Sequence, residues 1–275
     1  MISIITAIYN QISMNRLFLE YLNRYTHNKF ELIIIDNGST DGSDDFFEKN
    51  GAVVIRNEAN YSYPHCMNQG IAKATYDNLV FLNNDLLVSK DWDKKILEIM
   101  NLHGLEIATC CATDRVESNE ATYRSQKKWK YIRNPLLFLF GPGYYNLKLM
   151  HYLNYGNWDI YTKKRYQLFG NKIKEGIAGS NVFMKHSALD KIGLWDIRIQ
   201  SADFDLFIRA KLRSIEVGDI KPVNLILGIY FHHFIRLTVK SNYPPFKDLA
   251  NIISIEEKWD EGINKILEES GMKIH

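Results

Sequence analysis

Short apolar runs alternate with amphipathic segments along the chain from Ile2 to Thr113. Five of the runs have the length and the β-branched content of buried strands: Ile2–Ile8, Phe30–Ile35, Ala52–Ile55, Leu79–Leu82 and Ile107–Thr113. The segments between them carry apolar residues at helical spacing or a proline near their start, which predicts helices over Met14–Tyr25, Asp41–Lys49, Pro64–Lys73 and Asp91–Asn101. Strands that are apolar on both faces and alternate with helices predict an α/β fold with a mostly parallel central sheet flanked by helices.

Polar segments follow four of these strands, at Thr6–Asn10, Asp36–Thr40, Asn57–Tyr63 and Asn83–Asp85. The last of them interrupts the otherwise apolar stretch LVFLNNDLLV. Sheets of this kind bind ligands outside the carboxyl ends of their strands, so we expect the four segments to share one edge and to face a ligand. The alternative for both Asp36–Thr40 and Asn83–Asp85 is an ordinary turn, because their residue types are also those of turns.

The first strand-to-helix turn, TAIYNQISMN, contains no glycine. It therefore lacks the G-x-G-x-x-G pattern of dinucleotide enzymes, and the G-x-x-x-x-G-K-[ST] phosphate loop is absent from the chain as well. A phosphorylated ligand would need another partner for its charge. The usual substitute is a divalent cation that carboxylates recruit and that bridges phosphate oxygens.

Composition sets broad limits on the function. The 275 residues are 46% hydrophobic and 24% charged with a net charge of +2, which is typical of a globular protein of one or two domains and gives no reason to expect a nucleic acid partner. The three cysteines, Cys66, Cys110 and Cys111, show no C-x-x-C spacing, which argues against a disulfide framework and a zinc site. The opening residues show no secretory signal, and we expect a cytoplasmic protein.

Several motifs resemble those of family 2 glycosyltransferases, in the same order and spacing. They are SIITAIYN, ELIIIDNGSTDGS, NQGIAKA and LVFLNND, followed by IAGSNVFMKHSALDKIGLWDIRIQSADFDLFIRA. The resemblance covers about residues 1–101 and 177–233, and it implies the GT-A fold. On this basis we expect a nucleotide-sugar-binding half at 1–114, an insertion at 115–176, and an acceptor and catalytic half with C-terminal helices at 177–275.

The resemblance also implies a set of contacts to a nucleotide-diphosphate sugar. These are Thr6, Ala7, Tyr9, Asn10, Asp36, Asn37, Gly38, Ser39, Asn68, Asn83 and Asn84. Asp36 can accept from the imide N–H of uracil or thymine, which favours a UDP or dTDP donor, and Tyr9 can lie against the base or ribose. Many relatives have arginine where this chain has Met67, next to Asn68, and that departure puts one donor contact in doubt.

The same resemblance implies a metal site and a catalytic base. Asp85 corresponds to the metal-binding aspartate, with His232 or His233 completing the site, and imidazole among oxygen ligands tilts the expectation from Mg²⁺ toward Mn²⁺. The motif Asn83-Asn84-Asp85 has only one carboxylate, which lowers the expected metal affinity. Asp203 corresponds to the general base, although Ala202 replaces the family's usual glutamate. Asp203 also suits the N-cap of a helix over Phe204–Leu212.

These assignments predict an inverting, metal-dependent hexosyltransferase that acts on a hydroxyl of a saccharide or lipid-linked saccharide, in the manner of enzymes of bacterial surface-polysaccharide assembly. The sparse metal motif and Ala202 leave open a weak or inactive relative that binds a nucleotide or glycan without turnover. A nucleotidyltransferase is disfavoured, because those enzymes carry a glycine-rich, basic loop after the first strand and TAIYNQ is neither.

The segment from Arg115 to Gly176 fits no family motif and interleaves aromatic with basic residues. The aromatic residues are Trp129, Tyr131, Phe138, Phe140, Tyr144, Tyr145, Tyr152, Tyr155, Trp158 and Tyr161; the basic ones are Lys127, Lys128, Lys130, Arg133, Lys163, Lys164 and Arg165. Aromatic faces stack on sugar rings, and basic aromatic surfaces also rest on membranes. An acceptor wall, a mobile lid, a peripheral membrane contact, a dimer patch and a simple core all remain open for this segment.

Overall fold

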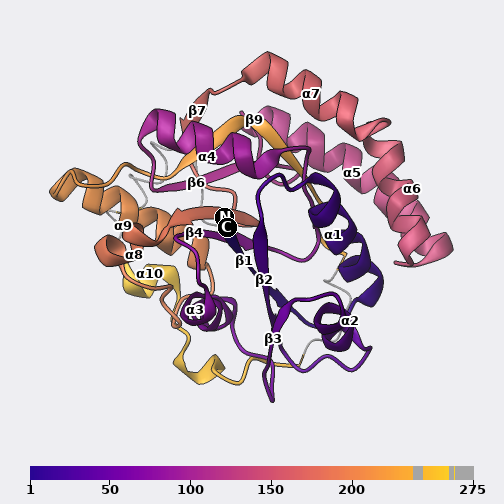
Figure 1. Cartoon of the computed structure of the whole chain (residues 1–275), viewed down its shortest axis with the longest axis horizontal. Helices are drawn as coiled ribbons and strands as arrows, with labels where there is room; N and C mark the ends of the chain where they lie inside the picture. The colour runs from indigo at the N-terminus through magenta and orange to yellow at the C-terminus, as the bar shows by residue number, and fades with distance from the viewer. Residues whose placement is uncertain (238–243, 260–262, 264–275) are drawn as a thin grey trace.

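The computed structural model describes residues 1–237, 244–259 and 263 (Figure 1). Its strands are β1 (Ile2–Ile8), β2 (Phe30–Asp36), β3 (Val53–Arg56), β4 (Asn78–Leu82), β5 (Leu86–Leu87), β6 (Ile107–Ala112), β7 (Ile173–Glu175), β8 (Asn181–Lys185) and β9 (Asn224–His233). Its helices are α1 (Ile12–Tyr25), α2 (Ser43–Lys49), α3 (Tyr63–Lys73), α4 (Trp92–His103), α5 (Asn119–Phe140), α6 (Tyr144–Tyr155), α7 (Trp158–Phe169), α8 (His186–Ile192), α9 (Ala202–Glu216) and α10 (Ile255–Lys258), with a 3₁₀ turn at Leu249–Asn251.

All nine strands belong to one sheet, in the order β3-β2-β1-β4-β8-β6-β9-β5, with β7 paired to β9. The N-terminal strands β3, β2, β1 and β4 are parallel, and β6 and β9 are parallel further along. Strand β8 lies antiparallel between β4 and β6, so the two halves of the chain share a single sheet. The predicted α/β fold with a mostly parallel, helix-flanked sheet is confirmed.

A separate hydrophobic core covers each face of the sheet. The period-2 alternation of β1 sends Ile4 and Ile8 into one core and Ile5 into the other. The first core contains α1 and α4, while the second contains α3, α8 and α9 (Figure 1). Burial on both faces explains why these strands read as continuous apolar runs in the sequence.

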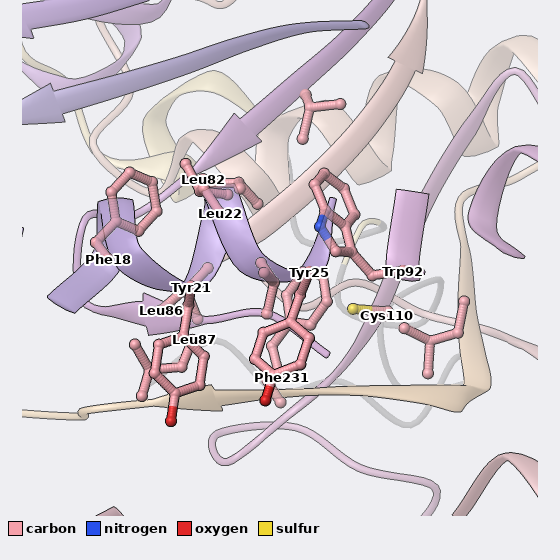
Figure 2. Close-up of a cluster of buried hydrophobic side chains, with 14 of the residues drawn as sticks. Phe18, Tyr21, Leu22, Tyr25, Leu82, Leu86, Leu87, Trp92, Cys110 and Phe231 are labelled. Atoms are coloured by element: carbon pink, nitrogen blue, oxygen red, sulfur yellow. The ribbon is translucent and has the colours of Figure 1, made fainter. Parts of the chain in front are cut away.

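Helix α1 packs its apolar stripe on the short strand β5 and its neighbours. Figure 2 shows this cluster, in which the labelled side chains are Phe18, Tyr21, Leu22, Tyr25, Leu82, Leu86, Leu87, Trp92, Cys110 and Phe231. Leu86 and Leu87 of β5 are fully buried and pair with His233 and His232 of β9. The apolar residues after the polar triplet thus hold Asp85 against the end of β9.

The sequence placed the N-terminal elements to within about two residues, as expected for strongly periodic segments. The two-residue strand β5 and the division of 115–176 into three helices were not predicted. Of the aromatic residues in that segment, Trp129 and Trp158 are buried, whereas Tyr131, Phe138 and Tyr145 are exposed. The segment therefore contributes both to the core and to the surface. The predicted C-terminal helices lie partly outside the described residues, since only α10 is described there.

Candidate functional site

The polar loops after β1, β2 and β4 meet around one open cavity of about 290 Å³. Six of the residues predicted to contact a donor or metal line it: Ala7, Tyr9, Asn37, Asn83, Asn84 and Asp85. Ile8, Gln11, Asn60, Tyr61, Tyr63 and Phe246 complete the wall. The cavity lies at the carboxyl ends of parallel strands, where α/β sheets place their ligands.

Asp85 and His233 face each other at one end of this cavity. The Nε2 atom of His233 lies 3.3 Å from Oδ1 of Asp85, at ion-pair distance, and that oxygen is buried without a hydrogen bond. On its other side, Nδ1 of His233 lies 2.9 Å from Oδ1 of Asp114. Ser180 donates to the same Asp114 oxygen at 3.3 Å. The result is a carboxylate–imidazole–carboxylate row.

The charges of this row shift the pKa values of its members. Burial lowers the pKa of His233, but the carboxylates of Asp85 and Asp114 outweigh that effect and hold it well above its ordinary value. Burial raises the pKa of Asp114, yet the adjacent His233 brings the net shift below the usual range. Without a bound metal, the two carboxylates therefore favour the protonated form of His233.

His232 points away from Asp85. Successive residues of a strand face opposite sides, and the fully buried ring of His232 lies with Nδ1 2.9 Å from the Tyr155 hydroxyl and 3.1 Å from Oγ1 of Thr113. Burial holds its pKa well below the ordinary value, so the ring is neutral. Of the two histidines that the sequence offered, the structure brings only His233 to the aspartate.

The loops after β1 and β2 hold each other in place. The backbone N–H of Asn10 donates to Ser39 Oγ at 2.7 Å, and the backbone N–H of Thr40 donates to Asn10 Oδ1 at 2.7 Å. The Asp36 carboxylate accepts from the backbone N–H of Ser39, and burial raises its pKa despite these bonds. Gly38 adopts a φ of +84°, which a residue with Cβ would adopt only with strain. The segment thus adopts a tight bend, the alternative considered for it, and it borders the cavity through Asn37, while its contact with a donor stays a prediction.

The remaining amide side chains form a network beneath the cavity. Asn37 donates to Asn60 and to the backbone of Tyr61, and Asn57 donates to Asn37. Asn84 donates to Asn15 of α1 at 2.8 Å. These bonds fix the position of the polar side chains before any ligand is present.

Six of the predicted donor contacts do not line the cavity: Thr6, Asn10, Asp36, Gly38, Ser39 and Asn68. Thr6 is fully buried in β1, and its hydroxyl has no hydrogen bond within the described part of the chain. Asn68 exchanges two hydrogen bonds with the backbone of Trp195, at 2.8 and 3.0 Å. This pair ties α3 to the loop before α9, and Met67 beside it is fully buried. Contact of Thr6 or Asn68 with a donor stays a prediction.

Asp203 lies in the first turn of α9, whose N-cap is Ser201. The helix begins earlier than the predicted Phe204, so Asp203 is not the N-cap residue itself. Burial raises the pKa of Asp203, backbone N–H groups of Phe204 and Asp203 partly offset this, and the negative charge of Asp114 raises it further. The carboxylate also packs directly on Gly179, where a Cβ atom would lie 2.1 Å from Oδ2.

Asp205, two residues along α9, has a different environment. It is fully buried and pairs with Arg209 at 2.8 Å and with Lys258 of α10 at 2.6 Å. It fastens the C-terminal segment to α9. The two aspartates of the motif ADFD thus differ: Asp205 is paired with two cations, whereas no ion pair involves Asp203 within the described part of the chain.

Asp114, Ser180 and Gly179 are the site residues that the sequence interpretation missed. Asp114 directly follows the predicted strand Ile107–Thr113. The rule that pointed to Asn83–Asp85, a polar residue at the carboxyl end of a strand, would also have found it. Gly179 and Ser180 carry no such signal, because their role depends on β8 entering the sheet between β4 and β6.

Within residues 1–237, 244–259 and 263, no group of three or more His, Cys, Asp or Glu side chains could hold a metal ion. Asp85 and His233 supply two candidate ligands. Hard divalent cations are commonly held by one or two carboxylates together with substrate phosphates, so two protein ligands fit a cation that a diphosphate completes. The placement of Asp85 Oδ1 3.3 Å from His233 Nε2 and the orientation of His233 by Asp114 agree with such a donor set.

Comparison with known proteins places this geometry in context. The family model for glycosyl transferase family 2 matches residues 3–193. The chain is 27% identical over 145 residues to the "Putative glycosyltransferase EpsH" of Bacillus subtilis, an alignment that spans 48% of this chain and 42% of that protein. The chain thus spans less than half the length of this curated relative.

Two solved structures share the fold at low sequence identity. One is the mannosyltransferase PcManGT from Pyrobaculum calidifontis in complex with GDP-Man and Mn²⁺, with a TM-score of 0.54, 12% identity, and coverage of 88% of this chain and 58% of that chain. The other is S. aureus TarS 1-349, with a TM-score of 0.52, 13% identity, and coverage of 84% and 60%. The family model covers most of the sheet and its polar edge, and the chain belongs to glycosyl transferase family 2.

Proposed function

We propose that this chain transfers a sugar from a nucleoside-diphosphate donor to a hydroxyl group of a saccharide or lipid-linked saccharide, with inversion at the anomeric carbon. The observation that carries the proposal is the Asp85–His233 pair at the polar end of the parallel strands, in which the buried Asp85 Oδ1 has His233 as its neighbour at 3.3 Å. Family membership, the fold shared with PcManGT and TarS, and the cavity at that edge support it.

Asp85 and His233 would hold the divalent cation, and Asp114 would fix the orientation of the His233 ring. Such a cation neutralises the negative charge that develops on a departing diphosphate. Because His233 is protonated when no metal is bound, it must lose that proton to become a ligand. Mn²⁺ is favoured over Mg²⁺ because one ligand is an imidazole.

Asp203 would act as general base toward the acceptor hydroxyl. Its raised pKa makes it a better proton acceptor than an exposed aspartate, and within the described residues no cation is paired with it. The hydroxyl proton passes to the carboxylate as the new C–O bond forms and the bond to the diphosphate breaks. A single displacement from the opposite face inverts the anomeric centre.

Donor preference for UDP or dTDP follows from Asp36, whose carboxylate could accept the imide N–H of uracil or thymine. TarS has been solved with UDP and PcManGT with GDP-Man, so the shared fold accommodates either class of base. Asp36 is already bonded to the backbone of Ser39, which fixes its position at the start of the loop.

The direct test is release of nucleoside diphosphate from a panel of UDP-, dTDP- and GDP-sugars with Mn²⁺, with Mg²⁺ and with EDTA. We expect release from a pyrimidine donor that requires metal and falls about 10²- to 10⁴-fold in Asp203→Asn, the usual worth of a general base. Asp190→Asn, an exposed carboxylate on α8, is the matched control.

The alternative function is a relative that binds the nucleotide or a glycan without turnover, favoured by the single carboxylate of Asn83-Asn84-Asp85 and by Ala202 in place of the family's glutamate. Metal-dependent nucleotide binding with no release from any donor, unchanged by Asp203→Asn, would support this alternative and contradict the transferase.

A further inference from the structure

Helix α5 and the turn that joins it to α6 present a large apolar surface to solvent. Phe138 is 89% exposed, Leu139 and Phe140 are each 64% exposed, and Tyr145 at the start of α6 is 85% exposed. Three of these four residues are consecutive at the end of α5, and grouped exposed apolar side chains mark interaction sites more often than single ones do. We refer to Phe138, Leu139, Phe140 and Tyr145 as the apolar tip.

A basic stripe leads along α5 to the apolar tip. Tyr123, Lys127, Lys130, Asn134 and Phe138 recur at spacings of three or four residues, so they share one face of the helix. Together with Arg133 and Arg236, most of this face borders an open groove of about 810 Å³. The groove therefore has cationic walls, and the apolar tip follows it at the C-terminal end of α5.

The opposite side of α5 is anchored in the core. The Trp129 ring is buried against His232 and Phe234 of the β9 end, and its Nε1 donates to the backbone of Ile235 at 3.2 Å. This packing holds the helix rigidly and keeps its basic stripe outward. It also places the stripe beside the strand that carries His233.

No acidic residue occurs between Glu120 and Asp159. Of the six cations in that interval, Arg124 and Lys148 pair with Glu120 and Glu20 at 3.6 and 3.0 Å. Lys127, Lys130 and Arg133 line the groove instead. A second copy of the chain docked here through a two-fold axis would bring these cations against each other, which is unfavourable. An anionic lipid surface has the complementary charge, accepts the apolar tip among its acyl chains, and accommodates tyrosine at the headgroup level.

We propose that the apolar tip and the basic stripe of α5 dock this protein on the surface of an anionic lipid bilayer. No helix within the described ranges is long and apolar enough to cross a bilayer, so the contact would be peripheral. The tip would enter the interface, and the lysines would lie at the level of the lipid phosphates. This surface would bind the bilayer whether or not the cavity binds a sugar donor.

The test is co-sedimentation of the full chain with vesicles of phosphatidylcholine alone and of phosphatidylcholine mixed with phosphatidylglycerol. We expect binding to the anionic vesicles only, and weakening as salt shortens the Debye length from about 10 Å at 0.1 M to about 3 Å at 1 M. Lys127→Gln/Lys130→Gln should reduce binding about 25-fold, about five-fold for each lysine.

Phe138→Ser/Phe140→Ser should reduce the same binding by about ten-fold or more for each ring that no longer enters the interface. The matched control is Leu102→Ser/Ile215→Ser, whose side chains are 65% and 64% exposed on α4 and α9 and should bind as the wild type does. All these positions are exposed, and circular dichroism verifies that each variant is folded.

Equal binding to neutral and anionic vesicles, no binding at all, or unchanged binding of both double variants would overturn the proposal. So would a wild-type dimer that Phe138→Ser/Phe140→Ser converts to monomer while vesicles stay unbound, because the apolar tip would then join copies of the chain.

Discussion

Substitution of Gly179 by alanine should impair catalysis with little effect on folding. A Cβ at this position would lie 2.1 Å from Oδ2 and 2.7 Å from Cγ of Asp203. Ordinary contact begins at 3.4 Å, so the oxygen must retreat by about 1.3 Å. The φ of Gly179 is not in the left-handed region, so the backbone itself accepts alanine.

The size of the effect follows from that displacement. A misplacement of about 1 Å can cost a catalytic group about 10²-fold in rate, so we expect kcat to fall on the order of 10²-fold. Asp203 is half-buried as a residue, and rotation of its carboxylate would relieve the contacts of Oδ2 and Cγ while its Cβ stays 3.1 Å from the added methyl group. The free energy of unfolding should therefore change by only about 1 kcal/mol. Nucleotide binding should be unchanged, because Gly179 does not line the cavity.

The assay is steady-state release of nucleoside diphosphate with the best donor of the panel, together with a thermal melt with and without nucleotide. Gly143→Ala is the matched control, since its φ of −69° suits alanine and no atom lies within 4 Å of the added Cβ. Full activity in Gly179→Ala would refute the placement of Asp203 as base. A loss of activity that parallels a loss of stability would refute the steric argument.

Three further predictions concern the same site and its support. Asp203→Asn should fold at least as stably as wild type at pH 7. The raised pKa of Asp203 means that burial disfavours its charged carboxylate, and the cost of that charge to folding grows as pH rises through this pKa. Thermal melts at several pH values measure the difference, and a variant less stable than wild type at pH 7 would contradict it. Asp114→Asn should weaken metal affinity about 10- to 100-fold by releasing the His233 ring, measured by Mn²⁺ titration, and unchanged affinity would exclude that role. Gly70→Ala should cost about 1–3 kcal/mol in urea unfolding because its Cβ would lie 2.2 Å from Ile5 Cγ2, and a neutral result would show that α3 can shift away from β1.

The pattern of the sequence was sufficient to predict the N-terminal sheet and its polar edge. Continuous apolar strands such as Ile2–Ile8 admit few other structures, and the rule for carboxyl-terminal edges then locates Asn83–Asp85. The choice between His232 and His233 could not be made from sequence, because both are histidines and either imidazole suits a metal. The pairing of Leu86 with His233 decides which ring meets Asp85, and pairing register is a tertiary property.

The role of Asn68 could not be decided from the sequence either. Its position in the motif suggested a ligand contact, whereas its side chain exchanges hydrogen bonds with the backbone of Trp195. An asparagine amide can serve either role, and only the approach of a distant loop determines which groups it meets. The sequence also left the role of the α5–α7 region undecided, because aromatic residues with helical spacing occur both in cores and on docking surfaces.

The central claim is that the polar edge binds a nucleoside diphosphate through a cation held by Asp85 and His233. A melting experiment with UDP, dTDP, GDP and CDP, each with Mn²⁺ or EDTA, tests it directly. A nucleotide at about 100 times its dissociation constant adds about 2.7 kcal/mol to the native state, or about 5–10 °C for a chain of this size. We expect this shift in melting temperature for one pyrimidine nucleotide with Mn²⁺. The shift should disappear in EDTA, in Asp85→Ala and in His233→Gln, whereas Asp190→Ala should show the same shift as wild type. A shift that survives both substitutions, or no shift with any nucleotide, would contradict it.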